Sequence, residues 1–234
     1  MAGRASVSDH EKSLIEKFLR NIPIFKSISE AYLEQIARDV KSVRCKKGGT
    51  VFFQSDESVD LYIVLNGKLR ASLFDEEGDE LVLATFNQGD FFGEMSLLDG
   101  ASRSATVIAE EDSTLGVLKR EKFLHAIKQN PMIAIDLLAI VVKRLRKTDS
   151  MLESLVFFDV DERLVKLLLQ IAKAQGEKDS RGFYKVRKLT QKDLASRIGA
   201  SREAISKALK ILAIRKMVVE EDGFFLVSQN AEKE

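Results

Sequence analysis

The chain has 234 residues, of which 45% are hydrophobic and 31% charged, a composition typical of one large globular domain or two smaller ones. Its formal net charge of +1 excludes a protein that is basic overall, although separate domains can carry opposite charges. Cys45 is the only cysteine, which excludes an intrachain disulfide and a cysteine-rich metal cluster. The start, MAGRASVSDHEK, lacks the apolar core of a signal peptide, and the most apolar window, 133–142, is too short to cross a bilayer. We therefore expect a cytoplasmic protein.

The first third of the chain changes from helical to strand-like spacing. Apolar residues recur at helical spacing over residues 9–36. From Lys41 onward the chain consists of short β-rich runs such as TVFF, ELVLATF and STLGVL, separated by glycines. The dipeptide Asn66-Gly67 predicts a hairpin between the two strands that flank it. Many short strands at this spacing predict an antiparallel jelly roll, and we assign residues 1–130 to this N-terminal domain.

A long helix is expected after Pro131, because proline is well tolerated in the first turn of a helix. Its apolar residues have a near-heptad period, which predicts that residues 131–157 form a dimerisation helix. The alternative is a helix that packs on its own domain. Thr148 and Asp149 interrupt the apolar seam, so they either set the register of two helices or contact a ligand. The seam consists of Leu138, Val141, Val142, Leu145, Leu152 and Leu155.

Residues 158–234 open with an amphipathic helix, DERLVKLLLQIAKA, and continue with two shorter helices. Thr190 is placed to cap the first short helix, with Asp193 at the position of a capping-box acid. Gly199 is expected to end that helix, and Ser201 to cap the next one. Two short helices joined by a glycine turn predict a helix-turn-helix, and residues 217–227 predict a β-hairpin wing that turns at Asp222-Gly223. The second helix has an apolar side of Ile205, Ala208, Leu209 and Leu212, opposite Arg202, Glu203, Ser206, Lys207 and Lys210.

Charge supports a nucleic-acid interface in this region. Residues 185–216 contain ten Lys and Arg against two carboxylates, a net charge of +8 that leaves −7 for the rest of the chain. Such a localised basic field is what phosphate binding requires, whereas the alternative is a solvated helical surface without a ligand. Arginine can bond guanine bidentately, glutamate can accept from cytosine, and lysine can contact a further purine. The predicted DNA-binding residues are Thr190, Lys192, Ser201, Arg202, Glu203, Ser206 and Lys207, with Thr190 and Lys192 at phosphates.

The order of strand-rich domain, seam helix and helix-turn-helix resembles the bacterial catabolite activator, or cyclic AMP receptor protein, family of transcription regulators. Three motifs carry the resemblance: FGEMSLLDGASRSATV, KRLRKTDSMLESLVFFDVDER and IGASREAISKALKIL. The resemblance extends from about Ile22 to Val227. It implies an α+β fold with an N-terminal antiparallel β jelly roll that binds a cyclic nucleotide, a long dimerisation helix and a C-terminal winged helix-turn-helix.

The first motif resembles the phosphate-binding cassette of cyclic-nucleotide domains. The resemblance implies that Glu94 accepts a hydrogen bond from the ribose 2′-hydroxyl and that Arg103 pairs with the cyclic phosphate. A guanidinium offers directed donors to a buried phosphodiester, and a carboxylate that holds a ribose should not pair with that arginine. Ser104 and backbone amides near Gly93 would bond phosphate or ribose oxygens. The expected ligand-binding residues are Gly93, Glu94, Met95, Arg103, Ser104, Ala105, Arg144, Thr148 and Asp149.

By resemblance, the second motif is expected to bind the base of the nucleotide, and the third motif is expected to bind DNA. Thr148 falls where the family reads the adenine amino group, and Asp149 falls where the second subunit contributes a contact. The type member of the family has serine at the position of Asp149, and a carboxylate accepts from the amino group of adenine or guanine. Cyclic AMP is therefore the expected ligand, and cyclic GMP stays open. Lys207 stands where the family has arginine, so the implied TGTGA-like half-site has a weaker contact there.

The resemblance further implies three partners: double-stranded palindromic DNA, a second copy of the chain and RNA polymerase. A single cysteine excludes an iron–sulfur cluster, and His10 and His125 form no recognisable haem pattern. No set of catalytic residues stands in register for nucleotide hydrolysis or transfer, so we expect neither an enzyme nor a bound metal. The alternative left open is a relative that binds DNA constitutively or answers to another ligand, with a vestigial nucleotide pocket.

Overall fold

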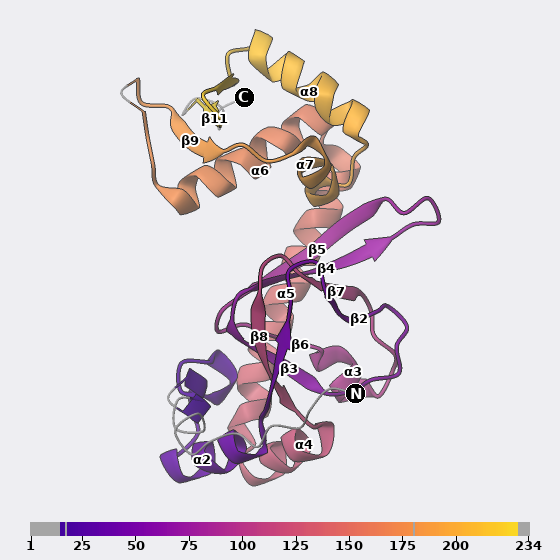
Figure 1. Cartoon of the computed structure of the whole chain (residues 1–234), viewed down its shortest axis with the longest axis vertical. Helices are drawn as coiled ribbons and strands as arrows, with labels where there is room; N and C mark the ends of the chain where they lie inside the picture. Colours follow the sequence, from indigo (N-terminus) through magenta and orange to yellow (C-terminus); the bar gives the residue numbers. More distant parts are fainter. Residues whose placement is uncertain (1–14, 17, 180, 229–234) are drawn as a thin grey trace. The chain divides into compact units, whose positions relative to one another are not determined.

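The computed structural model describes residues 15–16, 18–179 and 181–228 (Figure 1). Residues 9–14 of the expected N-terminal helical segment, including His10, lie outside the described residues. The chain divides into two compact units, which we call unit 1 (described residues up to 73, with 83–146) and unit 2 (74–82, with the described residues from 147). The predicted mixture of helices and antiparallel sheets is confirmed. Among the described helices, none alone is long and apolar enough to cross a membrane. The helices 120–129 and 132–157 reach that length and hydrophobicity only together, and the chain bends by 116° between them.

Two four-stranded sheets form a β-roll, most of which belongs to unit 1. Strand β8 pairs antiparallel with both β1 and β3, and β7 pairs antiparallel with both β2 and β4. The predicted antiparallel roll is thereby confirmed. The first sheet has the order β1 (Lys41–Cys45), β8 (Ser113–Leu118), β3 (Leu61–Asn66) and β6 (Phe91–Phe92). The second has the order β2 (Thr50–Phe52), β7 (Thr106–Ala109), β4 (Lys68–Phe74) and β5 (Glu80–Asn87).

The hairpin predicted at Asn66-Gly67 is wrong. β3 pairs with β6 and β8, whereas β4 belongs to the other sheet, so this dipeptide carries the chain from one sheet to the next. Gly67 has φ +100°, and a Cβ on it would lie 2.7 Å from the Cα of Ser113. The local turn signal was outweighed by burial, because Val64 and Leu69 on either side pack into a core shared by strands of both sheets.

Unit 1 contains two apolar clusters. One lies between the first sheet and the helical elements: the 3-10 helix η1 (Pro23–Phe25), α2 (Glu30–Asp39), α4 (Arg120–Gln129) and the first half of α5 (Met132–Phe157). The other fills the roll and contains the packed rings of Phe52, Tyr62, Phe86 and Phe92, whose neighbouring centroids are 5.0–5.8 Å apart.

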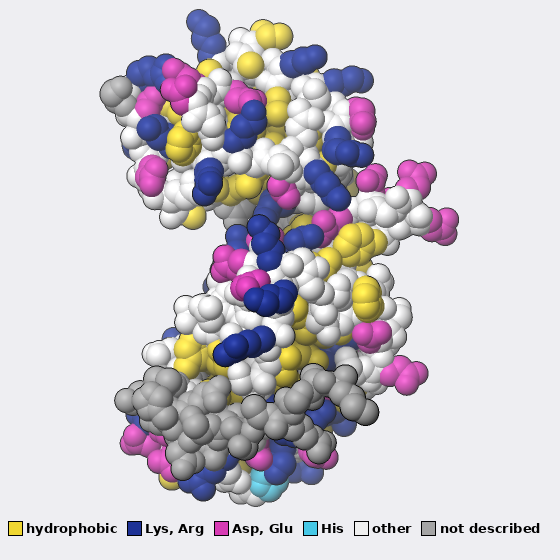
Figure 2. All heavy atoms as spheres, in the orientation of Figure 1, with side chains coloured by type: hydrophobic (Ala, Val, Ile, Leu, Met, Phe, Trp, Pro, Cys, Tyr) yellow, Lys and Arg dark blue, Asp and Glu magenta, His cyan; other side chains and the backbone are white. Residues whose placement is uncertain are grey.

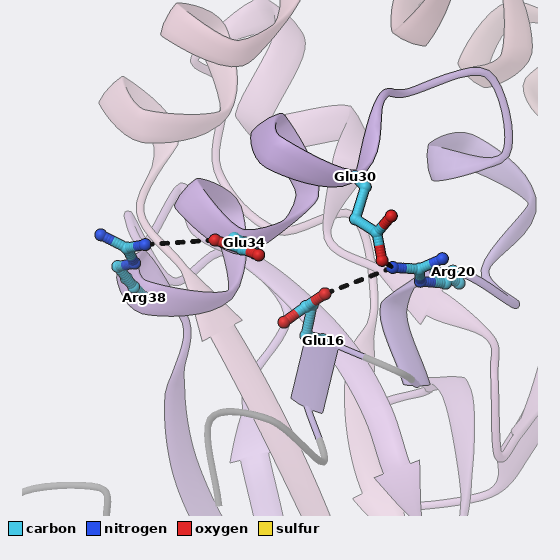
Figure 3. Close-up of polar contacts among 5 residues, drawn as sticks. All are labelled: Glu16, Arg20, Glu30, Glu34 and Arg38. Atoms are coloured by element: carbon cyan, nitrogen blue, oxygen red, sulfur yellow. Dashed lines mark hydrogen bonds and ion pairs between the residues drawn. The ribbon is translucent and has the colours of Figure 1, made fainter. Parts of the chain in front are cut away.

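Ion pairs lie on the surface of the N-terminal helical segment of unit 1. Arg20 pairs with Glu16 and Glu30, and Arg38 pairs with Glu34 at 3.3 Å (Figure 3). Solvated pairs of this kind each contribute about 0–1 kcal/mol to the free energy of unfolding. The apolar clusters rather than these surface pairs therefore stabilise the helical part of unit 1.

Helix α5 begins at Met132, directly after Pro131 as predicted. It exposes a row of large apolar side chains spaced alternately three and four residues apart, except that Asp149 takes the place between Leu145 and Leu152. Val141, which the sequence assigned to this row, instead packs against the core of unit 1. For Val141, the reading of a helix packed on its own domain is thus correct. The exposed row consists of Ile135, Leu138, Val142, Leu145, Leu152 and Val156, which are 47–64% exposed.

Unit 2 contains the predicted helix-turn-helix and wing, both confirmed. Its helices are α6 (Val160–Gln175), α7 (Gln191–Ile198) and α8 (Arg202–Ile214). Its sheet has the order β10 (Val218–Glu221), β11 (Phe224–Val227) and β9 (Tyr184–Arg187), of which β9 was not predicted. The helices and the sheet share one core, which includes Leu164, Leu168, Val186, Leu194, Ile205, Leu212 and Phe225.

Candidate functional site

A short helix that the sequence did not predict, α3 (Glu94–Asp99), organises the site in unit 1. It begins after Gly93, which has φ +86°, and ends at Gly100, which has φ +79°. A Cβ on Gly93 would lie 2.5 Å from Nη1 of Arg103 and 2.9 Å from the backbone oxygen of Asp60. Only glycine therefore allows the chain to pass this closely to the guanidinium while turning into the helix.

Arg103 is a buried cation, 2% exposed, with hydrogen bonds from each of its three nitrogens. Its Nε donates to Oγ of Ser58 at 2.9 Å, Nη1 to the carbonyl of Gly93 at 3.0 Å, and Nη2 to the carbonyl of Asp60 at 2.8 Å. Each of these acceptors is a neutral oxygen. The positive charge of Arg103 is thus positioned rigidly, without a hydrogen-bonded carboxylate among the described residues.

Aromatic rings surround the same guanidinium. Its carbon lies 4.2 Å from the ring centroid of Phe52 and 5.5 Å from that of Tyr62, which are distances at which a ring face attracts a cation. Burial lowers the pKa of Arg103, an effect that Tyr62 and the nearby acidic side chains of Asp60 and Glu94 oppose. Burial likewise raises the pKa of Tyr62. The surroundings therefore remove water from Arg103, which strengthens its attraction for an anion.

Glu94 is the second buried charge of the site, with a side chain 8% exposed. As expected, it makes no hydrogen bond to Arg103. Its Oε1 instead accepts from Nη1 of Arg144 at 2.7 Å, and Nη2 of Arg144 donates to the carbonyl of Phe91 at 2.5 Å. Arg144, which was expected near the ligand, therefore reaches the site through Glu94. The site therefore holds two buried side chains of opposite charge: Glu94 bonds Arg144, and Arg103 bonds neutral oxygens.

The remaining predicted ligand residues differ in position. Ser104 and Met95 are exposed and adjacent, since Oγ of Ser104 donates to Sδ of Met95 at 3.5 Å. Ala105 is buried in the core of the roll. Thr148 and Asp149 follow Arg144 by about one turn of α5 and belong to unit 2. The residues brought together in unit 1 are therefore Gly93, Glu94, Met95, Arg103, Ser104, Ala105 and Arg144.

The sequence reasoning missed the groups that hold Arg103. Ser58 and Asp60 precede it by 45 and 43 residues, in the segment between β2 and β3. In the sequence, Phe52 and Tyr62 are recognisable only as apolar residues of strands, and nothing indicates that their rings contact Arg103. No short-range pattern connects these positions to Arg103, because the folding of the two sheets is what brings them together.

The helix-turn-helix of unit 2 has the predicted caps. Oγ1 of Thr190 accepts from the amide of Asp193 at 3.1 Å, and the Asp193 carboxylate accepts in return from the amide of Thr190 at 3.3 Å. Oγ of Ser201 accepts from the amide of Ala204 at 3.1 Å. From α6, Nη1 of Arg163 donates to the carbonyl of Ile198 at 2.6 Å, which fixes the end of α7. Both ends of the turn between α7 and α8 are therefore hydrogen-bonded.

The predicted base-reading side chains lie on the surface of α8. Arg202, Glu203 and Lys207 are exposed and Ser206 is half-buried, while Thr190 and Lys192 are exposed at the start of α7. Hydrogen bonds from its own backbone amide and from the hydroxyl of Ser201 hold the pKa of Glu203 below its usual value, and Arg202 adds to the effect. Glu203 is thus ionised and acts only as an acceptor near neutral pH. Figure 2 shows Lys and Arg side chains over the visible face of unit 2.

Comparisons with known proteins assign the two halves separately. Residues 42–130 match the family of the cyclic nucleotide-binding domain, and residues 162–229 match the Crp-like helix-turn-helix domain. The CRP-like cAMP-activated global transcriptional regulator of Mycobacterium tuberculosis is 31% identical over 92% of this chain and 96% of its own length. The cyclic AMP receptor protein of Thermus thermophilus is 32% identical over 83% of this chain and 87% of its own length.

Solved structures agree with these matches. The catabolite activator protein of Thermus thermophilus is 32% identical, with a TM-score of 0.53 over 90% of this chain and 95% of its own. The c-di-GMP responsive global regulator CLP of Xanthomonas campestris, 23% identical, shares the fold, with a TM-score of 0.75 over 85% of this chain and 99% of its own. The chain therefore belongs to the catabolite activator, or cyclic AMP receptor protein, family of transcription regulators.

Proposed function

We propose that this protein is a homodimeric transcription regulator of the cytoplasm that binds cyclic AMP and then a palindromic, TGTGA-like DNA site. The observation that carries the ligand proposal is Arg103, a buried guanidinium whose hydrogen bonds all go to neutral oxygens. Burying a charge without a hydrogen-bonded counter-charge costs free energy, and an anionic ligand that bonds the guanidinium offsets that cost.

The residues of unit 1 fit a cyclic nucleotide. Arg103 supplies directed donors for the single charge of the cyclic phosphodiester. Glu94 uses Oε1 for Arg144, and a carboxylate has a second oxygen, so the same side chain can also accept from a ribose hydroxyl. Ser104 and the backbone amides beside Gly93 would complete the contacts to phosphate and ribose. A phosphate and a ribose on one ligand account for both buried charges.

The base and the dimer are proposed from α5. Thr148, together with Asp149 of the second protomer, would read the amino group of adenine, and cyclic GMP remains the competing ligand. The exposed apolar row of α5 would form the dimer seam. Ligand binding then changes the populations of two packings of the α5 pair, in proportion to its differential affinity for them.

For DNA recognition, the paired α8 helices would take up the spacing of successive major grooves, about 34 Å. Arg202, Glu203 and Lys207 would read bases, while Thr190 and Lys192 would hold phosphates, with Ser201 and Ser206 beside them. RNA polymerase would be the protein partner of the DNA-bound dimer. In this scheme residues 1–130 bind the nucleotide, residues 131–157 form the dimer and residues 158–234 bind DNA.

An equilibrium titration with cyclic AMP, cyclic GMP and 5′-AMP tests the ligand. The wild type should bind cyclic AMP saturably, and Arg103→Lys should weaken binding by at least about tenfold because lysine loses the directed donors. Arg38→Lys, a change at an exposed ion pair of unit 1, is the control and should bind like the wild type. Absence of saturable binding of either cyclic nucleotide by the wild type would refute the ligand proposal.

A second candidate is DNA binding that needs no nucleotide. The observation in its favour is that Glu94 already pairs with Arg144 and that each nitrogen of Arg103 already donates a hydrogen bond. Fluorescence anisotropy with a labelled TGTGA palindrome, with and without cyclic AMP, separates the two candidates. Equal affinity in both conditions supports constitutive binding, whereas tighter binding with cyclic AMP supports the regulator proposed above.

A further inference from the structure

The tip of the wing in unit 2 is acidic. Glu220, Glu221 and Asp222, which we call the wing tip, are all exposed at the turn between β10 and β11. Glu220 forms an ion pair with Lys188, and Oε2 of Glu221 lies 2.6 Å from Nη2 of Arg181. Two wing-tip carboxylates therefore engage two cations of a unit whose 185–216 segment is strongly basic.

The wing tip is held next to the start of the helix-turn-helix. The amide of Lys188 donates to the carbonyl of Gly223 at 2.9 Å, and Lys188 precedes Thr190, the N-cap of α7, by two residues. In helix-turn-helix proteins the first helix crosses the DNA backbone, and helix N-termini contact phosphates. A phosphate near Thr190 would accordingly lie in the field of the wing-tip carboxylates.

We propose that the wing tip lowers the affinity of this protein for the DNA backbone, by pairing with Lys188 and Arg181 and by repelling phosphate. The inference rests on the proposed function, since it requires DNA binding. Non-specific affinity is almost entirely electrostatic, whereas specific affinity also includes base contacts. A change that weakens phosphate contacts therefore lowers the affinity for any DNA sequence and leaves the base contacts unchanged.

A purely structural role makes a different prediction. If the two ion pairs served only to stabilise the sheet, their removal would change the free energy of unfolding slightly, because exposed pairs contribute little. It would not change DNA binding. The salt dependence of DNA binding distinguishes the two roles, since each phosphate newly contacted by a cation adds about 0.9 to the slope of log K against log salt.

The experiment compares Glu220→Gln, Glu221→Gln and the double variant with the wild type on a non-operator duplex and on a TGTGA palindrome, over a series of salt concentrations. The control is Glu34→Gln, which removes one charge from another exposed arginine–glutamate pair, in unit 1 (Figure 3). Glu220→Gln should bind the non-operator duplex roughly five- to tenfold more tightly at 0.1 M salt. Glu221→Gln should have a smaller effect, because Arg181 keeps its ion pair with Asp179 at 2.8 Å. The double variant should steepen the salt slope by about 1–2.

The wing variants should also bind the palindrome more tightly, by a similar factor, and Glu34→Gln should bind both duplexes like the wild type. Thermal unfolding of each variant checks that the fold is retained. If wild type binds DNA and the double variant matches Glu34→Gln in affinity and salt slope, the role of the wing tip is overturned while the proposed function stands. If the wild type binds neither duplex at any salt, the proposed function fails, and the inference fails with it.

Discussion

At the residue scale, the site of unit 1 keeps two buried charges apart. Arg103 bonds oxygens from two separate segments, 58–60 and Gly93, and Glu94 bonds an arginine from α5. The sequence predicted the two residue types and that they would not pair. It could not predict Ser58 and Asp60 as the acceptors, since a hydroxyl and a backbone carbonyl more than forty residues away leave no local pattern.

Glu203 at the start of α8 makes stability depend on pH in a defined direction. Its pKa is depressed, so its ionised form stabilises the folded state above the usual carboxyl range, and this contribution is lost as pH falls through the lowered pKa. Glu203→Gln should therefore lower the unfolding midpoint at pH 7 and reduce its fall between about pH 5 and pH 2.

Thermal unfolding of the full chain at several pH values measures this effect. Glu34→Gln, which removes one surface carboxylate of unit 1, is the control for the change in net charge. If the melting temperature of Glu203→Gln falls with pH as steeply as that of the wild type, the stabilisation expected from the lowered pKa of Glu203 is contradicted.

At the scale of elements, the passage from β3 to β4 depends on a close approach between Gly67 and Ser113. Gly67→Ala should lower the free energy of unfolding by about 2–4 kcal/mol, because it adds an overlap with Ser113 to an unfavourable φ. Gly78→Ala is the matched control: its φ is +82°, but a Cβ there meets nothing within 4 Å, so it should cost only about 1 kcal/mol. Urea unfolding measures both, and equal losses would contradict the close approach.

Elements with local signals were predictable, and those set by distant packing were not. The capping box of Thr190 and Asp193 and the glycine after α7 each lie within a few residues, so their sequence alone defined the boundaries. By contrast, α3 is only six residues long and is flanked by two left-handed glycines, and β9 becomes a strand because it pairs with β11. The passage of the chain from one sheet to the other at Gly67 was not predictable for the same reason, because β3 and β4 pair with strands that are distant in sequence.

At the scale of the whole molecule, α5 carries an exposed apolar row too long to be a set of isolated surface residues. Leu145→Lys should weaken the proposed dimer at least about a hundredfold, because it places two charges in the centre of the seam. Sedimentation equilibrium measures the dissociation constant. The control is Val43→Lys, which changes a similarly exposed apolar residue on β1 and should leave association unchanged. A wild type that is monomeric at micromolar concentration would contradict the seam.

The hydrogen bonds of Arg103 have a consequence for selectivity. The guanidinium has five N–H donors, of which three are used by Ser58, Gly93 and Asp60, so an incoming anion can bond the other two without displacing these acceptors. Inorganic phosphate or sulfate would bring charge but no hydroxyl for Glu94, whereas the proposed nucleotide would engage both buried side chains. We therefore expect the site to bind a cyclic nucleotide more tightly than either small anion.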